Sequence, residues 1–370
     1  MTTNIWQNDY NPFNKWKVLV WHDRMKAIKN GEFMAPVNIA LDLNQGTGES
    51  KLCGGYKCNF CMSNLEDSGK KAEIPVEILM DIPRFYHDWG VKSICVAGHH
   101  SDPLMYNHKY LSLFLMECKK YGIEVGIVSN GRLYTDDLSD VVVSTCKWSG
   151  WSINCGSLET YQKITGMDEE NFGRVILKMR RMANHGGKHN IGYKFLITDE
   201  NYSEILNAIE LASWVGARHF QIRPCELPPE RSSLIDIGVV ESQVREGIDK
   251  YERPGEFEIF GIREKFTSNF MKKPPKRCIA SPLGSTWKAD GSVVICPDRR
   301  WSWDKPNMVM GNFITDGLES IKEKWGGAEH IKMIDAANES LSDCIRCTAY
   351  SWHEIYENVV EKDNMDVSLI

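Results

Sequence analysis

The sequence has no hydrophobic run of the about 18 residues that a membrane-spanning helix requires, and its first residues lack the basic and apolar segments of a signal peptide. Positive charge is not in excess either, because 44 Lys and Arg residues face 50 Asp and Glu residues and leave a net charge of −6. A composition of 42% hydrophobic and 25% charged residues excludes intrinsic disorder and collagen-like chains. We therefore expect a soluble globular protein for which a membrane is excluded and nucleic acid is a disfavoured partner.

The 370 residues predict two domains, or one large domain with an appendage, and they include 12 cysteines. Disulfide frameworks belong to short secreted chains, so a long chain without a secretion signal is expected in a reducing compartment, the cytoplasm, where clustered cysteines indicate metal or redox chemistry. Seven cysteines form two groups: Cys53, Cys58 and Cys61, then Cys278, Cys296, Cys344 and Cys347. The other five are predicted to be small buried hydrophobic residues: Cys95, Cys118, Cys146, Cys155 and Cys225.

Strands and helices alternate through the middle of the chain. The predicted strands cover residues 37–43, 91–98, 123–130, 148–154, 190–198 and 218–224. The helical patterns between and after them cover residues 75–89, 109–122, 136–143, two stretches within 157–185, and 202–216. Such alternation predicts an α/β fold with parallel strands and right-handed crossovers, either a doubly wound sheet or a partial barrel.

Polar residues and glycines recur where the predicted strands end. Because ligands of such folds bind at the carboxyl ends of the strands, these residues predict a ligand bound across one rim. The candidates are Gly98 and Asp102 after the second strand, Ser129 and Asn130 after the third, Ser152 and Asn154 after the fourth, and Arg223 in the sixth.

The first cysteine group follows the first strand directly, in Cys53-Gly-Gly-Tyr-Lys-Cys58-Asn-Phe-Cys61. Glycines allow a backbone to wrap closely around an inorganic core, and thiolates are the ligands of iron–sulfur clusters. Three nearby thiols leave one iron open to another ligand, which is typical of a reactive centre. The alternatives are a zinc site completed by His99 or His100, and a loop that binds no metal.

This cysteine loop after the first strand, with Phe60 before the last cysteine and six β/α units behind it, resembles the radical S-adenosylmethionine (SAM) enzymes over residues 37–223. The resemblance implies a partial (β/α)6 barrel and a [4Fe–4S] cluster whose open iron binds S-adenosylmethionine. It also implies an external one-electron reductant such as flavodoxin or ferredoxin. In that family one electron cleaves the sulfonium to methionine and a 5′-deoxyadenosyl radical, which abstracts a hydrogen atom from the substrate.

Two stretches depart from the family pattern. Four residues separate Cys53 from Cys58 where the family has three, and two adjacent glycines are expected to absorb the extra residue. The family's Gly-Gly-Glu-Pro stretch is replaced by residues 97–103, in which Asp102 is the expected acceptor for the methionine amino group. The resemblance also implies that seven further residues lie near the cofactor: Phe60, Gly98, Ser129, Asn130, Ser152, Asn154 and Arg223.

The second cysteine group lies beyond a charged, proline-containing bridge. Cys278 and Cys296 flank an Asp290-Gly291 hairpin signal, and Cys344 and Cys347 form a Cys-x-x-Cys pair. Four such thiols ligate either one zinc or one [4Fe–4S] cluster. The order of these four cysteines along the chain is similar to that of the twitch domain, the short form of the SPASM extension. This resemblance implies one auxiliary [4Fe–4S] cluster. The expected domains are an extension (1–36), the core (37–225), a bridge (226–277) and a twitch-like domain (278–370).

We therefore expect a radical SAM enzyme, an oxidoreductase before an isomerase or a peptide maturase, that acts on a small molecule, sugar or peptide. An auxiliary cluster closed by four thiolates is expected to transfer electrons. The alternative function is a non-catalytic or redox-sensing protein in which both cysteine groups hold structural zinc or iron–sulfur centres.

Overall fold

The computed structural model describes residues 15–46, 53–61, 71–99, 101–185, 189–225, 227–261, 277–296, 308–339, 347 and 349–362. Within these residues an eleven-stranded sheet runs in the order β11-β10-β9-β1-β3-β4-β5-β6-β7-β8, with β2 paired to β1. The strands are β1 (Asn38–Gln45), β2 (Ala72–Glu73), β3 (Ser93–His99), β4 (Glu124–Ser129), β5 (Trp148–Ser152), β6 (Asn190–Ile197), β7 (His219–Pro224), β8 (Glu258–Gly261), β9 (Gly284–Trp287), β10 (Ser292–Val294) and β11 (Val309–Asn312).

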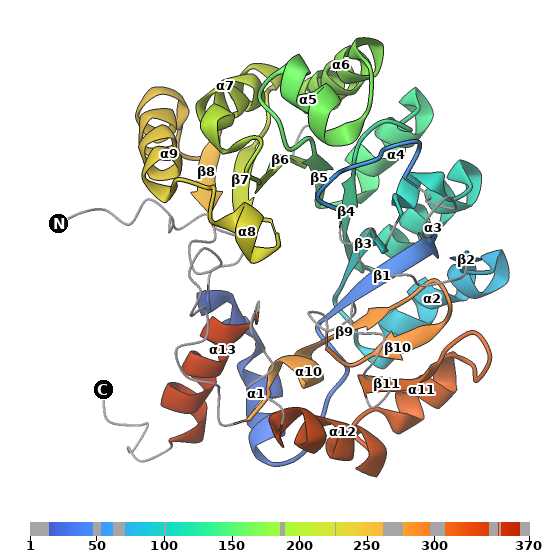
Figure 1. Cartoon of the computed structure of the whole chain (residues 1–370). Coiled ribbons are helices and arrows are strands. Elements are labelled where there is room, and N and C mark those ends of the chain that lie inside the picture. Colours follow the sequence, from blue (N-terminus) through green and yellow to red (C-terminus); the bar gives the residue numbers. More distant parts are fainter. Residues whose placement is uncertain are drawn as a thin grey trace.

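The strands from β1 to β8, with β2 left aside, form a continuous parallel series. The sheet curves without closing, because its path ends at β8 on one side and at β11 on the other. Figure 1 shows this open barrel with helices around its outer side. The predicted α/β class and partial barrel are thereby confirmed.

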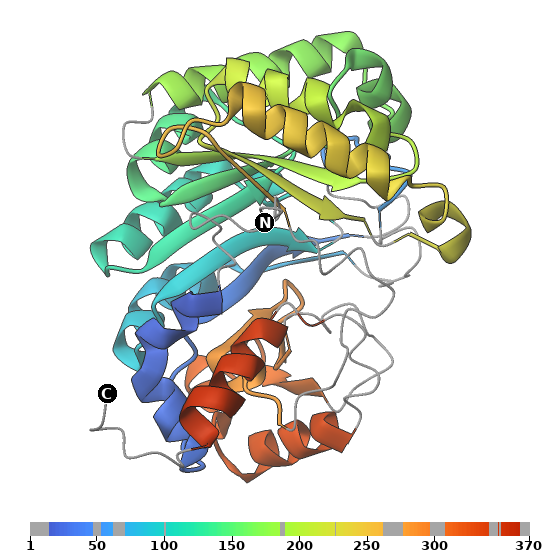
Figure 2. The same cartoon turned by 90° about the vertical axis from the view of Figure 1, so that its left-hand side faces the viewer.

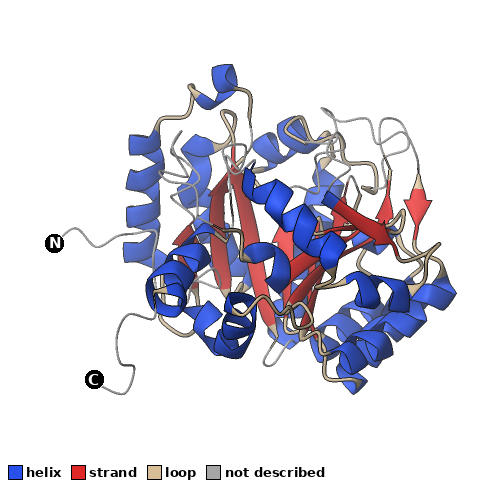
Figure 3. Ribbon diagram, turned by 90° about the horizontal axis from the view of Figure 1, so that it is seen from below, coloured by secondary structure: helices blue, strands red, loops and turns tan. Residues whose placement is uncertain are grey.

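Helices cover the convex face of the sheet, as Figure 3 shows from a second direction. The helices of the described residues are α1 (His22–Lys29), α2 (Val76–Trp89), α3 (His108–Lys120), α4 (Asp136–Thr145), α5 (Leu158–Thr165), α6 (Glu169–His185), α7 (Ile205–Val215), α8 (Pro229–Ser232), α9 (Ile237–Tyr251), α10 (Ala280–Leu283), α11 (Leu318–Lys324), α12 (Ala328–Glu339) and α13 (Tyr350–Ile355), of which α1, α8, α10 and α13 lie at the opening of the barrel (Figure 1). Short 3-10 turns lie at Lys15–Trp21, Pro103–Met105 and Tyr202–Glu204, and a π-helix at Tyr356–Glu361. None of the helices in the described ranges has the length and apolarity needed to cross a bilayer.

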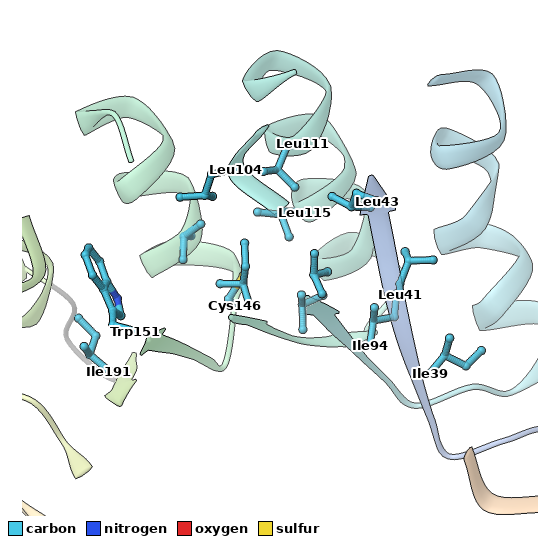
Figure 4. Close-up of a cluster of buried hydrophobic side chains, with 14 of the residues drawn as sticks. Ile39, Leu41, Leu43, Ile94, Leu104, Leu111, Leu115, Cys146, Trp151 and Ile191 are labelled. Carbon is cyan, nitrogen blue, oxygen red and sulfur yellow. The ribbon is translucent and has the colours of Figure 1, made fainter. Parts of the chain in front are cut away.

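The two faces of each barrel strand differ in chemistry because side chains alternate along a strand. In β1, Ile39, Leu41 and Leu43 are fully buried and belong to the main hydrophobic core. Figure 4 shows them beside Leu111 and Leu115 of α3, between strands and helices. The intervening positions of β1 include the polar residues Asp42 and Asn44, which are buried as well.

The C-terminal residues continue the barrel sheet rather than standing apart from it. Strand β9 pairs in parallel with β1, and Val293 of β10 pairs with Trp287 of β9, which places the predicted hairpin at Asp290-Gly291. Figure 2 shows these orange and red elements beside the blue helix α1. A second hydrophobic cluster joins them, made by Val18, Met25, Ile28, Ile279, Leu283, Ile355, Tyr356 and Val360.

Two details differ from the sequence expectations. The segment expected as a bridge contributes a strand, β8, which pairs with β7. Of the five cysteines expected in the core, Cys118, Cys146, Cys155 and Cys225 are buried, whereas Cys95 is half-buried.

Candidate functional site

The loop of residues 53–61 carries three half-buried thiols, those of Cys53, Cys58 and Cys61. Gly54 and Gly55 have φ angles of 65° and 92°, a region that side chains other than glycine's rarely adopt. The backbone then turns back, because the Tyr56 N–H donates to the Cys53 carbonyl at 3.5 Å. The two glycines therefore allow a tight turn between the first two cysteines.

Tyr56 anchors this turn in the core of the barrel. Its side chain is 5% exposed, and its hydroxyl is hydrogen-bonded to the Tyr161 hydroxyl and accepts from the Asn171 Nδ2 at 3.1 Å. The Asn171 Nδ2 also donates to the Tyr161 hydroxyl at 2.5 Å. Burial raises the pKa of Tyr56 to about 12, so the phenol stays neutral. The turn is thus tied to α5 and α6 by a buried network of polar groups.

The residues on either side of the second cysteine, Cys58, are attached to α5. The N–H groups of Lys57 and Asn59 donate to the carbonyls of Thr165 and Ile164 at 2.8 and 3.2 Å. These carbonyls belong to the last turn of α5, which otherwise leaves them without helical partners.

Arg231 fixes the same part of the loop from the opposite side. Its Nε and Nη2 donate to the Asp199 carboxylate at 3.0 and 2.7 Å, and its Nη1 reaches the Asn59 carbonyl at 3.4 Å. A guanidinium matches a carboxylate with two parallel hydrogen bonds, so Asp199 holds Arg231 in one orientation. Glu200 lies beside them and accepts from the Asn59 side chain.

The rim after β3 and β4 is organised by Asp102. Its carboxylate accepts from the Ser129 hydroxyl at 2.9 and 3.0 Å, from the Asn130 N–H at 2.6 Å and from the Leu104 N–H at 2.9 Å. The side chain is 4% exposed; burial raises the pKa of Asp102, although these hydrogen bonds favour its charged form. Both oxygens bind protein donors, so Asp102 joins the ends of β3 and β4, while its contact with the cofactor stays a prediction.

Asn130 connects this rim to the cysteine loop. Its Nδ2 donates to the Cys53 carbonyl at 3.1 Å, and its Oδ1 accepts from the Arg132 N–H at 3.0 Å. The chain Asp102–Asn130–Cys53 therefore links the ends of β3 and β4 to the first cysteine. Residues expected at one rim from sequence are here brought into contact.

The other rim candidates differ in their surroundings. Asn154 has a φ angle of 60°, and its Oδ1 accepts from the Leu196 N–H at 2.9 Å, so its side chain stabilises the strand ends. A Cβ atom at Gly98 would lie 1.8 Å from the Ser101 carbonyl oxygen, so only glycine fits there. Ser152 and Arg223 are half-buried at the ends of β5 and β7.

Phe60, the aromatic residue before the last cysteine, packs partly buried against the main core. Its carbonyl accepts from the Cys225 thiol at 3.8 Å, which joins the loop to the end of β7. A backbone hydrogen bond joins the second and third cysteines, because the Cys61 N–H donates to the Cys58 carbonyl at 3.1 Å.

The second cysteine group is described in part. Cys278, Cys296 and Cys347 are half-buried, whereas Cys344 lies outside the described residues, as does His100 of the zinc alternative. The Cys278 N–H donates to the Asn338 Oδ1 at 2.7 Å. His353 lies 3.7 Å from the Cys347 sulfur through its Nε2 and accepts from the Ile279 N–H at 3.3 Å through its Nδ1.

Sequence reasoning missed the residues that hold these loops in place, namely Tyr56, Tyr161, Asn171, Asp199, Arg231 and His353. Of these residues, only Tyr56 could have been found from its sequence position, because it lies between Cys53 and Cys58. The others contact the loops across long sequence separations. Within the described ranges no three His, Cys, Asp or Glu side chains are grouped as ligands of a single metal ion.

Solved structures of other proteins share the fold of this chain. SuiB of Streptococcus suis has a similar fold, with a TM-score of 0.62 and 14% identity over 93% of this chain and 78% of that one. The enzyme anSMEcpe, solved with bound AdoMet, has a TM-score of 0.59 and 13% identity over 86% of this chain and 89% of that one. No curated protein matches the chain. Residues 53–212, somewhat less than half of the chain, match the family model of the radical SAM superfamily.

Proposed function

We propose that this chain is a radical SAM enzyme in which Cys53, Cys58 and Cys61 hold a [4Fe–4S] cluster that binds S-adenosylmethionine. The single observation that carries the proposal is the loop of residues 53–61, whose three half-buried thiols lie on a turn held by both sides of the barrel rim. Thiolates on one loop are a donor set that fits such a cluster. When bound, the cluster and one electron from a reductant such as flavodoxin or ferredoxin supply methionine and a 5′-deoxyadenosyl radical.

The chain's own residues would position the reactants. Asn130 holds the Cys53 carbonyl, and Asp102 holds Asn130 in turn. Ser152 at the end of β5 and Arg223 near the end of β7 stay our candidates for contacts with the nucleotide, together with Phe60, Gly98, Ser129 and Asn154. Asp102 and Asn130 stay candidates as well, and both Asp102 and Asn154 also make polar contacts with protein groups.

A second [4Fe–4S] cluster at Cys278, Cys296, Cys344 and Cys347 completes the proposal. A cluster with four protein ligands has no open iron, which favours electron transfer over substrate binding. It would take the electron that a substrate radical loses together with a proton, so that the reaction is a two-electron oxidation.

The substrate class is a small molecule, sugar or peptide. SuiB has been solved with the precursor peptide SuiA, and anSMEcpe with AdoMet and the Cp18Cys peptide. These structures support testing peptides first.

Anaerobic purification with iron and sulfide analysis tests the proposal. Two [4Fe–4S] clusters predict about eight irons per chain and release of 5′-deoxyadenosine on reduction with S-adenosylmethionine. Cys61→Ala should lose about four irons and the nucleoside product. The buried Cys118 makes Cys118→Ala a matched control that should keep both.

Two results would overturn the proposal. Zinc in place of iron, with no 5′-deoxyadenosine, would establish a structural or redox-sensing metal protein. Full nucleoside release from the Cys61→Ala variant would remove the first cysteine group from the reaction. For the second group, Cys347→Ala should spare nucleoside release and abolish oxidised product.

A further inference from the structure

His353 contacts both halves of the second cysteine group. It lies in α13 and is 2% exposed, with its Nε2 3.7 Å from the Cys347 sulfur. Its Nδ1 is 3.3 Å from the backbone nitrogen of Ile279, the residue that follows Cys278. The side chain thus bridges the segments that carry the first and the last thiol of the group.

The backbone contact determines which nitrogen carries the proton. A backbone N–H can only donate, so the Nδ1 of His353 must accept and therefore has no hydrogen. A histidine ring without a hydrogen on Nδ1 is the neutral imidazole. A neutral imidazole with an unprotonated Nδ1 carries its hydrogen on Nε2, the atom that faces Cys347.

The same reasoning decides between two roles for the ring. A histidine ligand binds metal through a nitrogen without a hydrogen. Since the Nε2 of His353 is protonated, it is a donor toward the sulfur and not a ligand.

We infer that His353 donates an N–H···S hydrogen bond to the Cys347 thiolate and thereby raises the reduction potential of the auxiliary cluster. A hydrogen bond to a ligating sulfur withdraws electron density and stabilises the more negative, reduced cluster. His353 is a positioning and tuning residue, since it acts through Cys347. The inference rests on the proposed auxiliary cluster and adds to it the group that sets its potential.

The experiment isolates the auxiliary cluster. A background variant with Cys53, Cys58 and Cys61 replaced by alanine retains only the second group, and its midpoint potential is measured by a redox titration followed by electron paramagnetic resonance. In this background His353→Phe keeps a buried ring without a donor. We expect reduction to become about tenfold less favourable, which lowers the potential by about 59 mV for one electron.

Two further variants separate the hydrogen bond from general packing. His353→Gln restores an N–H donor and should recover most of the potential even where the phenylalanine variant folds poorly. The matched control is His330→Phe, because His330 is also buried and neutral, with a pKa lowered by burial to about 4, and it contacts Ser281 and Gly326. It should leave the potential unchanged.

The outcomes are distinguishable. An unchanged potential in an intact His353→Phe cluster overturns the inference and leaves the proposed function standing. A background variant that holds no iron–sulfur cluster overturns the proposed auxiliary cluster, and the inference with it. Selective loss of the cluster in His353→Gln, with iron retained in the His330→Phe control, would make His353 a ligand and refute the donor role.

Discussion

Replacing Asp102 by asparagine tests whether this carboxylate positions the cofactor rim. The carboxylate oxygens accept from Leu104, Ser129 and Asn130, all at 2.6–3.0 Å. An asparagine side chain offers one acceptor oxygen, and its NH2 group can only donate. In either orientation the NH2 group would face a backbone N–H, that of Asn130 or that of Leu104.

The expected loss of folding stability follows from the backbone N–H that is left facing the NH2 group. A buried donor that loses a charged acceptor costs about 1.5–3 kcal/mol, so Asp102→Asn should lower the free energy of unfolding by about 2 kcal/mol. Asp102→Ala leaves several donors without an acceptor and should cost about 4 kcal/mol. Because Asn130 donates to the Cys53 carbonyl, the asparagine variant should also bind S-adenosylmethionine more weakly.

Denaturant unfolding of the cluster-free chain measures the stability, and isothermal titration of the reconstituted protein measures nucleotide binding. Asp140→Asn is the control, because Asp140 is exposed on α4 and its replacement should change neither quantity. If Asp102→Asn unfolds like the wild type but loses nucleotide binding, Asp102 contacts the nucleotide directly and the positioning role is wrong.

Two further predictions concern buried groups. Tyr56→Phe should cost about 1–3 kcal/mol in denaturant unfolding and lower iron occupancy; Tyr86→Phe should change little, because the buried Tyr86 hydroxyl has no hydrogen-bond partner among the described residues. Burial lowers the pKa of His219 to about 3. The unfolded chain takes up this proton near pH 6.5, so stability should fall by up to about 1.4 kcal/mol per pH unit between about pH 6 and 3. In thermal unfolding against pH, His219→Gln should reduce that slope, whereas exposed His185→Gln should not.

Patterns within short stretches of sequence correctly predicted the barrel strands and the hairpin. Six parallel strands lie close to where hydrophobic periodicity placed them, and the hairpin forms at Asp290-Gly291. Strand β8, with only Glu258–Gly261, is too short to carry a periodic signal. The pairing of β9 with β1 joins residues about 250 positions apart, and no local pattern encodes such a register.

The same distinction applies to the site. Cysteine spacing alone identified the loop, but the partners that hold it come from distant segments, such as Asn171 and Arg231. Asp102 shows the limit most clearly. Its residue type suits an acceptor for an amino group, which stays a prediction, and the fold also brings hydroxyl and backbone donors to its oxygens that no local pattern announces. Residue type restricts which bonds a side chain can make, and only packing decides which ones form.

The one-residue insertion between Cys53 and Cys58 illustrates how a fold accommodates a departure from a family pattern. We propose that the turn absorbs the extra residue on the Cys53 side, where Gly54 and Gly55 adopt positive φ angles and Tyr56 enters the core. From Lys57 onward the backbone is tied to the end of α5 by separate hydrogen bonds. Because the two halves of the loop have independent anchors, the insertion need not displace Cys58 and Cys61. Deleting one glycine should therefore disturb Cys53 first, since the Tyr56 hydroxyl could no longer reach its buried partners without pulling the turn inward.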